Sequence, residues 1–379
     1  MCTLDELIQM PSFVLSKADV AKLLSGVSLS AFMADLADEI ERVYVDPGLA
    51  SIERIGWTQD LDTLEVMGCE ASDLSCVKSI SSIPSGAGPS TPTVTGTLVC
   101  TDAKSKEARL ICNAAILTSL RTATSTAVVL RRIAPDIETV GVIGAGVEGS
   151  CHAVVLALLL PSIRRITLTD VDPAHTRQSV EQVSALLAGE GVLADRHIEI
   201  ESAEISDKSA TQRSDVIVTA TYGTQEVIAS PDFLHPGVII AAVGADLRGK
   251  RELGLPLYDD ARFIADDLWQ CFQEGELAAA AHRLNIEMPE KSHRGILLDG
   301  RIIGVASLLD DSSPFMARQE PITIYDSTGF SGQDLAVARV ILRLLEEQQW
   351  EPKAWDPSRT EALTSSLGRT EDRNIIYPL

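Results

Sequence analysis

The sequence predicts an α/β fold, in which a doubly wound parallel sheet is inserted into a second, α+β domain. Three features predict it: a glycine-rich turn between an apolar run and a helix, an alternation of strands and helices from residue 140 onward, and an amphipathic helix at 334–347. Such alternation is typical of a parallel sheet with helices on both faces. The final helix indicates that the chain returns to its first domain.

The segment before the alternation has the pattern of an α+β domain. Its helical and strand-like stretches, taken in order, are helices at 17–24 and 29–43, strands at 52–57, 63–67 and 76–83, a Gly, Pro and Ser-rich loop at 84–92, a strand at 96–101 and a long helix at 115–133. Periodicity and turn residues support these assignments. We expect a first domain at 1–122, a nucleotide domain at 123–325 and a returning segment at 326–379, whose polar tail begins at 352.

The strands expected in the nucleotide domain are short and apolar. They lie at 140–143, 164–169, 198–201, 216–219, 238–243 and 263–265, with late strands at 302–306 and 322–326.

The turn at 144–149 joins the first of these strands to a helix at 147–160. Gly144 permits a tight turn, Gly146 lets the backbone approach a phosphate, and Gly149 lets the helix pack close to the strand. The helix N-terminus then faces a pyrophosphate. Strand, glycines, helix and second strand together predict a Rossmann-type dinucleotide site.

The second strand ends in Asp170, where an acid meets the adenosine ribose. A carboxylate there accepts hydrogen bonds from a 2′-hydroxyl and repels a 2′-phosphate, so NAD is favoured over NADP. The alternative, NADP, rests on Arg177 and the neighbouring His175, which could reach a 2′-phosphate.

Composition excludes several classes of partner. The chain has 379 residues, 45% of them hydrophobic, with a net charge of −22 and a pI near 4.6. So acidic a surface repels nucleic acid and anionic membranes. The seven cysteines are scattered and lack metal-ligand spacing, so neither a disulfide framework nor a metal site is indicated. With no signal peptide or transmembrane run in the pattern, we expect a cytoplasmic protein.

Asp246 is the candidate catalytic group. It follows the strand at 238–243 and precedes three cations, and ligands of open α/β sheets bind beyond the carboxyl ends of the strands. The alternative is a structural loop carboxylate paired with Lys250.

Five motifs together resemble the ornithine cyclodeaminase/μ-crystallin family. They are LTSLRTATSTAVV at 117–129, GAGVEG at 144–149, VGADLRGKREL at 243–253, IADDLWQCFQEGEL at 264–277 and IYDSTGFSGQDLAVARVI at 324–341. The resemblance implies an NAD-binding enzyme whose first domain binds a small amino-acid or imino-acid substrate and forms a homodimer.

The resemblance also implies roles for individual residues. The substrate carboxylate would be bound by Arg54, Lys78 and Arg121, with Thr328 also touching substrate. Asp246 would transfer the proton, and Glu65 would stand near the reacting centre. The cofactor contacts would be Thr93, Arg121, Val147, Glu148, Asp170, Thr221, Val243, Lys250 and Ser327, beside the three glycines.

One departure from the family bears on the substrate. After Lys78 the chain reads SISSIPSG, where ornithine cyclodeaminases typically carry Asn-Gly-His-Pro. We therefore expect an NAD(H)-dependent oxidoreductase that interconverts an α-amino acid and its imine or α-keto acid. The alternatives are a cyclodeaminase, which forms a cyclic imino acid with loss of ammonia and internal recycling of NAD, and a non-enzymatic ligand-binding protein of the μ-crystallin type.

Overall fold

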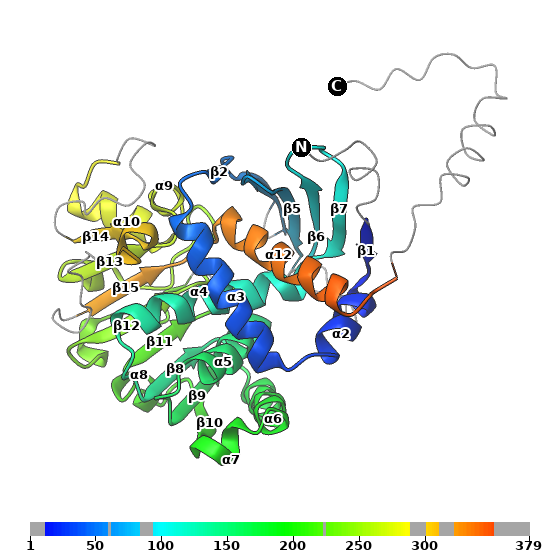
Figure 1. Ribbon diagram of the computed structural model, residues 1–379. Helices are drawn as coiled ribbons and strands as arrows, with labels where there is room; N and C mark the ends of the chain where they lie inside the picture. Colours follow the sequence, from blue (N-terminus) through cyan, green and yellow to red (C-terminus); the bar gives the residue numbers. More distant parts are fainter. Residues whose placement is uncertain are drawn as a thin grey trace.

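The computed structural model describes residues 12–59, 62–83, 94–222, 225–288, 301–310 and 322–351. The predicted loop 84–92, the predicted cofactor contact Thr93 and the tail from 352 lie outside the described residues. Two sheets make up the fold, and helices α3 (Leu29–Val45) and α12 (Ser331–Glu347) cross the middle of the molecule between them (Figure 1).

The larger sheet has eight described strands, all parallel, in the order β10-β9-β8-β11-β12-β15-β13-β14. Their bounds are β8 Thr139–Ile143, β9 Arg165–Asp170, β10 Glu199–Glu204, β11 Val216–Thr219, β12 Val238–Ala242, β13 Ala261–Ala265, β14 Ile302–Gly304 and β15 Ile322–Asp326. The central strands are buried along their whole length, which explains their continuous apolar runs. The doubly wound α/β fold predicted from the alternation is confirmed.

Helices cover this sheet and connect its strands. They are α5 (Val147–Leu159), α6 (Pro173–Gly189), α7 (Val192–Arg196), α8 (Ser209–Gln212), α9 (Leu268–Cys271), α10 (Gly275–Leu284) and α11 (Val305–Leu308), with 3-10 turns η1 (Pro231–Phe233) and η2 (Leu255–Tyr258). Asp172 caps α6 by accepting hydrogen bonds from the first backbone amides, as expected for a helix that begins with proline.

The smaller sheet is mostly antiparallel, in the order β1-β7-β6-β5-β4-β2, with β3 paired to β4. Its strands are β1 Phe13–Leu15, β2 Ala50–Ser51, β3 Ile55–Gln59, β4 Asp62–Glu70, β5 Leu74–Ser82, β6 Val94–Asp102 and β7 Ala108–Asn113. Side chains alternate between its two faces, as the pleat requires. Lys78 of β5 points inward, whereas its neighbour Val77 is exposed.

Three helices pack against the smaller sheet, namely α2 (Lys17–Ser25), α4 (Ala115–Ile133) and α12, and α3 packs on α4 and α12. Helix α12 packs against α3 and against strands β4 and β5, and α4 packs against both β6 and α5. The helix that ends the described chain therefore lies against the elements that begin it (Figure 1).

Local differences from the predicted elements have local causes. Of the predicted strand at 52–57 only residues 55–57 are strand, in β3, and Arg54 lies in the break between β2 and β3. The predicted strand at 302–306 ends at Gly304, because Gly304 is the N-cap of α11. Helix α12 begins three residues before the predicted start at 334. Strands β1 and β7 were not predicted. β1 is a three-residue edge strand, too short to show a periodicity, whereas the alternation in β7 was missed.

Candidate active site at the carboxyl edge of the parallel sheet

The glycine-rich turn has the geometry of a dinucleotide-binding turn. Gly144 has φ +101°, and a Cβ there would lie 2.4 Å from the carbonyl oxygen of Ala220. A Cβ on Gly149 would lie 1.9 Å from the carbonyl oxygen of Gly144, so the helix approaches the turn closely. A Cβ on Gly146 would meet no described atom within 4 Å. The backbone there is open to a ligand, which fits a pyrophosphate at the α5 N-terminus.

Asp170 ends β9 beside this turn. One of its carboxylate oxygens accepts a hydrogen bond from the backbone amide of Ala145 at 2.8 Å, and the other accepts from that of Asp172 at 3.3 Å. The carboxylate therefore fixes the turn, and it lies where it could accept a hydrogen bond from a ribose hydroxyl. His175 and Arg177, the basis of the NADP alternative, are exposed on α6.

A buried glutamate joins the ends of β11 and β12. The Glu252 carboxylate accepts hydrogen bonds from the Thr219 hydroxyl at 2.6 Å, from the amide and hydroxyl of Thr221 at 2.7 Å each, and from the amide of Gly244 at 3.0 Å. Thr221, a predicted cofactor contact, and the segment that leads to Asp246 are thus held together. Val243, another predicted contact, is buried at the end of β12.

Arg54 connects the two sheets. Its guanidinium donates to the carbonyl oxygens of Asp246, at 2.9 Å, and of Gly329, at 3.1 Å, and also to that of Thr328. Asp246 follows β12, whereas Thr328 and Gly329 follow β15. A cation from the smaller sheet therefore reaches the carboxyl edge of the parallel sheet. Glu274 and Glu65 balance its charge at 3.3 and 3.6 Å.

Lys78 and Arg121 meet at one carboxylate. Lys78 Nζ lies 2.9 Å from Asp334 Oδ1, and Arg121 Nε lies 3.2 Å from the same oxygen. All three side chains are at most 5% exposed. Asp334 lies in the first turn of α12, so β5, α4 and α12 converge at this point.

Gly329 brings Arg54 next to Arg121. Its φ is +91°, and a Cβ there would lie 3.0 Å from both terminal nitrogens of Arg121 and 3.2 Å from Nη2 of Arg54. A residue without a side chain lets both guanidiniums approach the backbone. The structure thus brings together the three cations, Arg54, Lys78 and Arg121, that the sequence placed at a substrate carboxylate.

Burial changes the acidity of several groups here. Burial and the neighbouring Arg121 lower the pKa of Lys78 to about 8. Burial raises the pKa of Glu65, and it raises the pKa of Glu148 to about 7. Because ionisable groups with perturbed pKa values cluster at functional sites, these shifts mark the same region as the geometry.

Asp246 lies in the loop after β12 with a half-exposed side chain. Its Oδ1 accepts from Lys250 Nζ at 2.9 Å, so the ion pair considered as the structural alternative is present. Lys250 also lies over the ring of Tyr222, 4.2 Å from its centroid. The pair does not exclude catalysis, since the Asp246 side chain remains 45% exposed.

The remaining predicted contacts follow β15 or begin α5. The Ser327 hydroxyl donates to Asp266 at 3.2 Å, and the Thr328 hydroxyl accepts from Gln270 at 2.9 Å. Both side chains are buried. Val147, the first residue of α5, is 65% exposed, and Glu148 follows it in the first helical turn.

Several residues of this region were not predicted: Glu252, Asp266, Glu274, Gln333 and Asp334. Asp334 and Gln333 belong to the motif at 324–341, and a usable signal was the pair of polar residues directly before the apolar run at 335–338. An acid in the first turn is also ordinary helix chemistry, so that signal is ambiguous.

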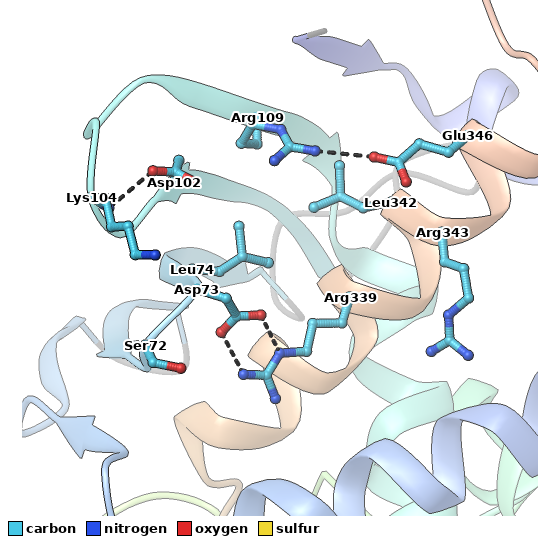
Figure 2. A pocket seen from close by; sticks show the side chains of 10 residues that line it. All are labelled: Ser72, Asp73, Leu74, Asp102, Lys104, Arg109, Arg339, Leu342, Arg343 and Glu346. Carbon is cyan, nitrogen blue, oxygen red and sulfur yellow. Dashed lines mark hydrogen bonds and ion pairs between the residues drawn. The ribbon is translucent and has the colours of Figure 1, made fainter. Parts of the chain in front are cut away.

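A separate hollow lies between α12 and the turns of the smaller sheet (Figure 2). It is lined by Ser72, Asp73, Leu74, Asp102, Lys104, Arg109, Arg339, Leu342, Arg343 and Glu346. Two ion pairs cross it, Arg339 with Asp73 at 2.6 Å and Arg109 with Glu346 at 3.1 Å. It shares no residue with the predicted site.

The described part of the chain holds no group of three His, Cys, Asp or Glu side chains arranged to bind a metal ion. No single helix within it is long and apolar enough to cross a membrane, and only the bent pair α2 and α3 has the required length and composition together.

The glycine turn, the parallel sheet and the polar residues beyond its carboxyl edge define a Rossmann-type dinucleotide-binding protein. More narrowly, the chain belongs to the ornithine cyclodeaminase/mu-crystallin family, whose sequence model matches residues 14–349. The family predicted from the five motifs is confirmed.

The proteins to which this chain is similar are named for different reactions. The L-lysine cyclodeaminase of Streptomyces rapamycinicus is 26% identical over 352 residues, 89% of this chain and 94% of the relative. A solved lysine cyclodeaminase, described with L-lysine, L-ornithine and L-2,4-diaminobutyric acid, has 29% identity and a TM-score of 0.73, covering 90% of this chain and 94% of the other. Delta(1)-pyrroline-2-carboxylate reductase of Thermococcus litoralis, solved with NADH and L-proline, has a TM-score of 0.76 at 20% identity, with 89% and 98% coverage.

Proposed function

We propose that this protein is an NAD(H)-dependent oxidoreductase that interconverts an α-amino acid and its imine or α-keto acid. The observation that carries the proposal is the convergence of Arg54, Lys78 and Arg121 on Gly329 and Asp334, at the carboxyl edge of a sheet that bears a dinucleotide turn. Several cations together bind a carboxylate well, and an arginine guanidinium can donate two parallel N–H hydrogen bonds to it.

The charge balance of the site supports a zwitterionic substrate. The three cations Arg54, Lys78 and Arg121 contact three protein carboxylates, those of Glu65, Glu274 and Asp334. The charges of these six groups therefore cancel before substrate enters. An amino acid adds one carboxylate and one ammonium, and so preserves the balance that a lone anion would disturb.

The side chains divide the chemistry between them. The three cations hold the carboxylate and so orient the neighbouring Cα. Bound NAD+ would supply the hydride acceptor, and Asp170 favours NAD over NADP. Asp246 accepts a proton from the substrate nitrogen as the C–N bond is oxidised, and returns it in the reverse direction. Lys250 holds Asp246 in the loop after β12.

Turnover assays test the proposal. Purified protein is incubated with NAD+ and L-alanine, L-ornithine or L-lysine, and both ammonia and NADH absorbance are followed. Net NADH together with ammonia is the expected result. NADH binding without turnover of any amino or imino acid, in either direction, would contradict the proposal and favour a non-enzymatic ligand-binding protein.

A cyclodeaminase is the second candidate function. The buried Glu65 beside Arg54 supports it, because a carboxylate next to the three cations could bind the second amino group of a diamino acid. The relatives named above also include cyclodeaminases. In that reaction the ω-amine displaces ammonia from the imine and the same hydride returns. Ammonia without net NADH is the result that identifies it.

Asp246→Asn tests the proton-transfer role. We expect kcat to fall by about 10²- to 10⁴-fold, because an amide cannot accept the proton. The matched control is Asp195→Asn, on the exposed face of α7, which should keep wild-type turnover. Unchanged turnover in a folded Asp246→Asn protein would remove Asp246 from the mechanism.

We also propose a homodimer formed through the smaller sheet. Strands β3 to β6 expose a set of apolar side chains on their outer face, namely Ile55, Trp57, Leu64, Val77 and Val99. Trp57 pairs across strands with Leu64, and Val77 with Val99, so two apolar pairs lie on this face of the sheet. Exposed apolar patches of this kind mark protein interfaces.

The cytoplasm remains the proposed compartment.

A further inference from the structure

A polar network lies inside the core where α3, α4, α12 and β15 meet. Its members are Tyr44, Ser125, Tyr325 and Gln333, all buried and each from a different one of these elements. Its surroundings are largely apolar, including Phe330, whose ring stacks on that of Tyr44 at 5.4 Å. Buried polar groups in such a place require hydrogen-bond partners.

Within the network, the Gln333 amide is oriented by its donors. Its Nε2 donates to the Tyr44 hydroxyl at 2.7 Å and to the Ser125 hydroxyl at 3.0 Å. Ser125 lies 2.9 Å from both the Tyr44 and the Tyr325 hydroxyls. Both amide protons are therefore used inside the network, so the carbonyl oxygen Oε1 points the other way. There it accepts a hydrogen bond from Arg121 Nη1.

The contact with Gln333 differs from the ion pair with Asp334. Asp334 attracts the Arg121 guanidinium by charge, at Nε. Gln333 is neutral and engages Nη1, so it restricts the rotation of the guanidinium without reducing its charge. A planar guanidinium binds a carboxylate well only when its donors face it correctly.

We propose that Gln333 is a positioning residue, which orients the Arg121 guanidinium toward the substrate carboxylate, while the hydroxyls of Tyr44, Ser125 and Tyr325 fix the Gln333 amide. The inference rests on the proposed function for the role of Arg121. A leucine of similar size would fill position 333 without any of these hydrogen bonds, so the distinctive contribution of the amide is the acceptor that it presents to Arg121.

Gln333→Leu is the first test. We expect KM for the amino acid to rise roughly ten-fold or more, as for loss of a hydrogen bond to a charged group, with kcat and NADH affinity nearly unchanged. Gln348→Leu, the same substitution at the exposed end of α12, is the control and should keep the wild-type KM. A wild-type KM in Gln333→Leu overturns the proposal.

A double-mutant cycle separates positioning from a general structural role. In an Arg121→Ala background, Gln333→Leu should leave KM unchanged, because the group that it orients is gone. An equal rise of KM in both backgrounds overturns the proposal. Tyr44→Phe provides a milder variant if Gln333→Leu fails to fold, and should raise KM in the same direction. Its control is Tyr258→Phe, which removes a buried hydroxyl from a separate hydrophobic cluster of the core and should keep the wild-type KM.

The proposed function and the positioning role can fail separately. If the wild type turns over no amino acid, the proposed function fails. The coupling between positions 121 and 333 is then measured by denaturant unfolding of the same four proteins. Non-additive unfolding midpoints support the contact that orients Arg121, and additive midpoints overturn it.

Discussion

At the residue scale, Lys78 links substrate binding to pH. Burial and the nearby Arg121 lower its pKa to about 8, so the ammonium loses its proton within an accessible range. Below that pH the side chain is charged and helps to hold a carboxylate, and above it the side chain is neutral. We expect KM for the amino acid to rise as the pH increases from about 7 to about 9, with a smaller effect on kcat. The pH profile of kcat/KM measures this.

Lys78→Arg provides the control for that profile. A guanidinium stays charged through this range, so the fall of kcat/KM near pH 8 should disappear in Lys78→Arg. The change in kcat/KM that comes from ionisation of the substrate amine should remain. A limb that persists at the same pH in Lys78→Arg would assign it to another group.

The residue scale also shows where sequence reasoning succeeds. Arg54, Lys78 and Arg121 were predicted from motifs, and the structure brings them to one place. Their partner Asp334 was not predicted, because an acid at the start of a helix has an ordinary local explanation. Only the packing of α12 against β5 reveals that this acid meets two cations.

At the element scale, the turn after β15 depends on Gly329. We expect Gly329→Ala to destabilise the protein by about 1–3 kcal/mol, because φ there is left-handed, and to raise KM, because the methyl group would displace both guanidiniums. Gly191→Ala is the matched control. Its φ is also positive, at +76°, and it lies between α6 and α7, so it should lose stability but keep the wild-type KM. Denaturant unfolding and steady-state kinetics give the two readouts, and equal KM values in both variants would contradict the account.

Elements differed in how well the sequence predicted them. The turn at 144–149 is a local feature whose glycines have fixed roles, so it could be recognised without knowledge of the fold. The break between β2 and β3 could not. Glu53 and Arg54 interrupt the apolar residues at 52–57, but charged residues also occur within exposed strands, and the contacts that hold Arg54 are with the turn after β15.

At the scale of the whole molecule, charge favours particular ligands. The chain carries a net charge of −22, yet its site contains three buried cations. The surrounding field repels free anions and affects zwitterions little. An amino acid therefore reaches the site more readily than a dicarboxylate of similar size.

The proposed homodimer depends on the outer face of the smaller sheet. We expect Leu64→Asp to convert the dimer to a monomer in sedimentation velocity, because it would bury a charge in the apolar patch. Leu186→Asp, at a leucine that is 52% exposed on α6, is the matched control and should remain dimeric. A wild-type protein that sediments as a monomer would remove the proposed interface.

The most direct measurement of the central claim is calorimetric titration of NADH-loaded protein with the amino-acid product or substrate, compared among the wild type, Arg54→Ala, Lys78→Ala and Arg121→Ala. We expect each substitution to weaken amino-acid binding by about ten-fold or more, as for loss of a charged hydrogen bond. The affinity for NADH should fall far less, including in Arg121→Ala, although Arg121 is also a predicted cofactor contact. Amino-acid affinity that is unchanged in all three folded variants would contradict the binding of the substrate carboxylate by these three cations, and with it the proposed reaction.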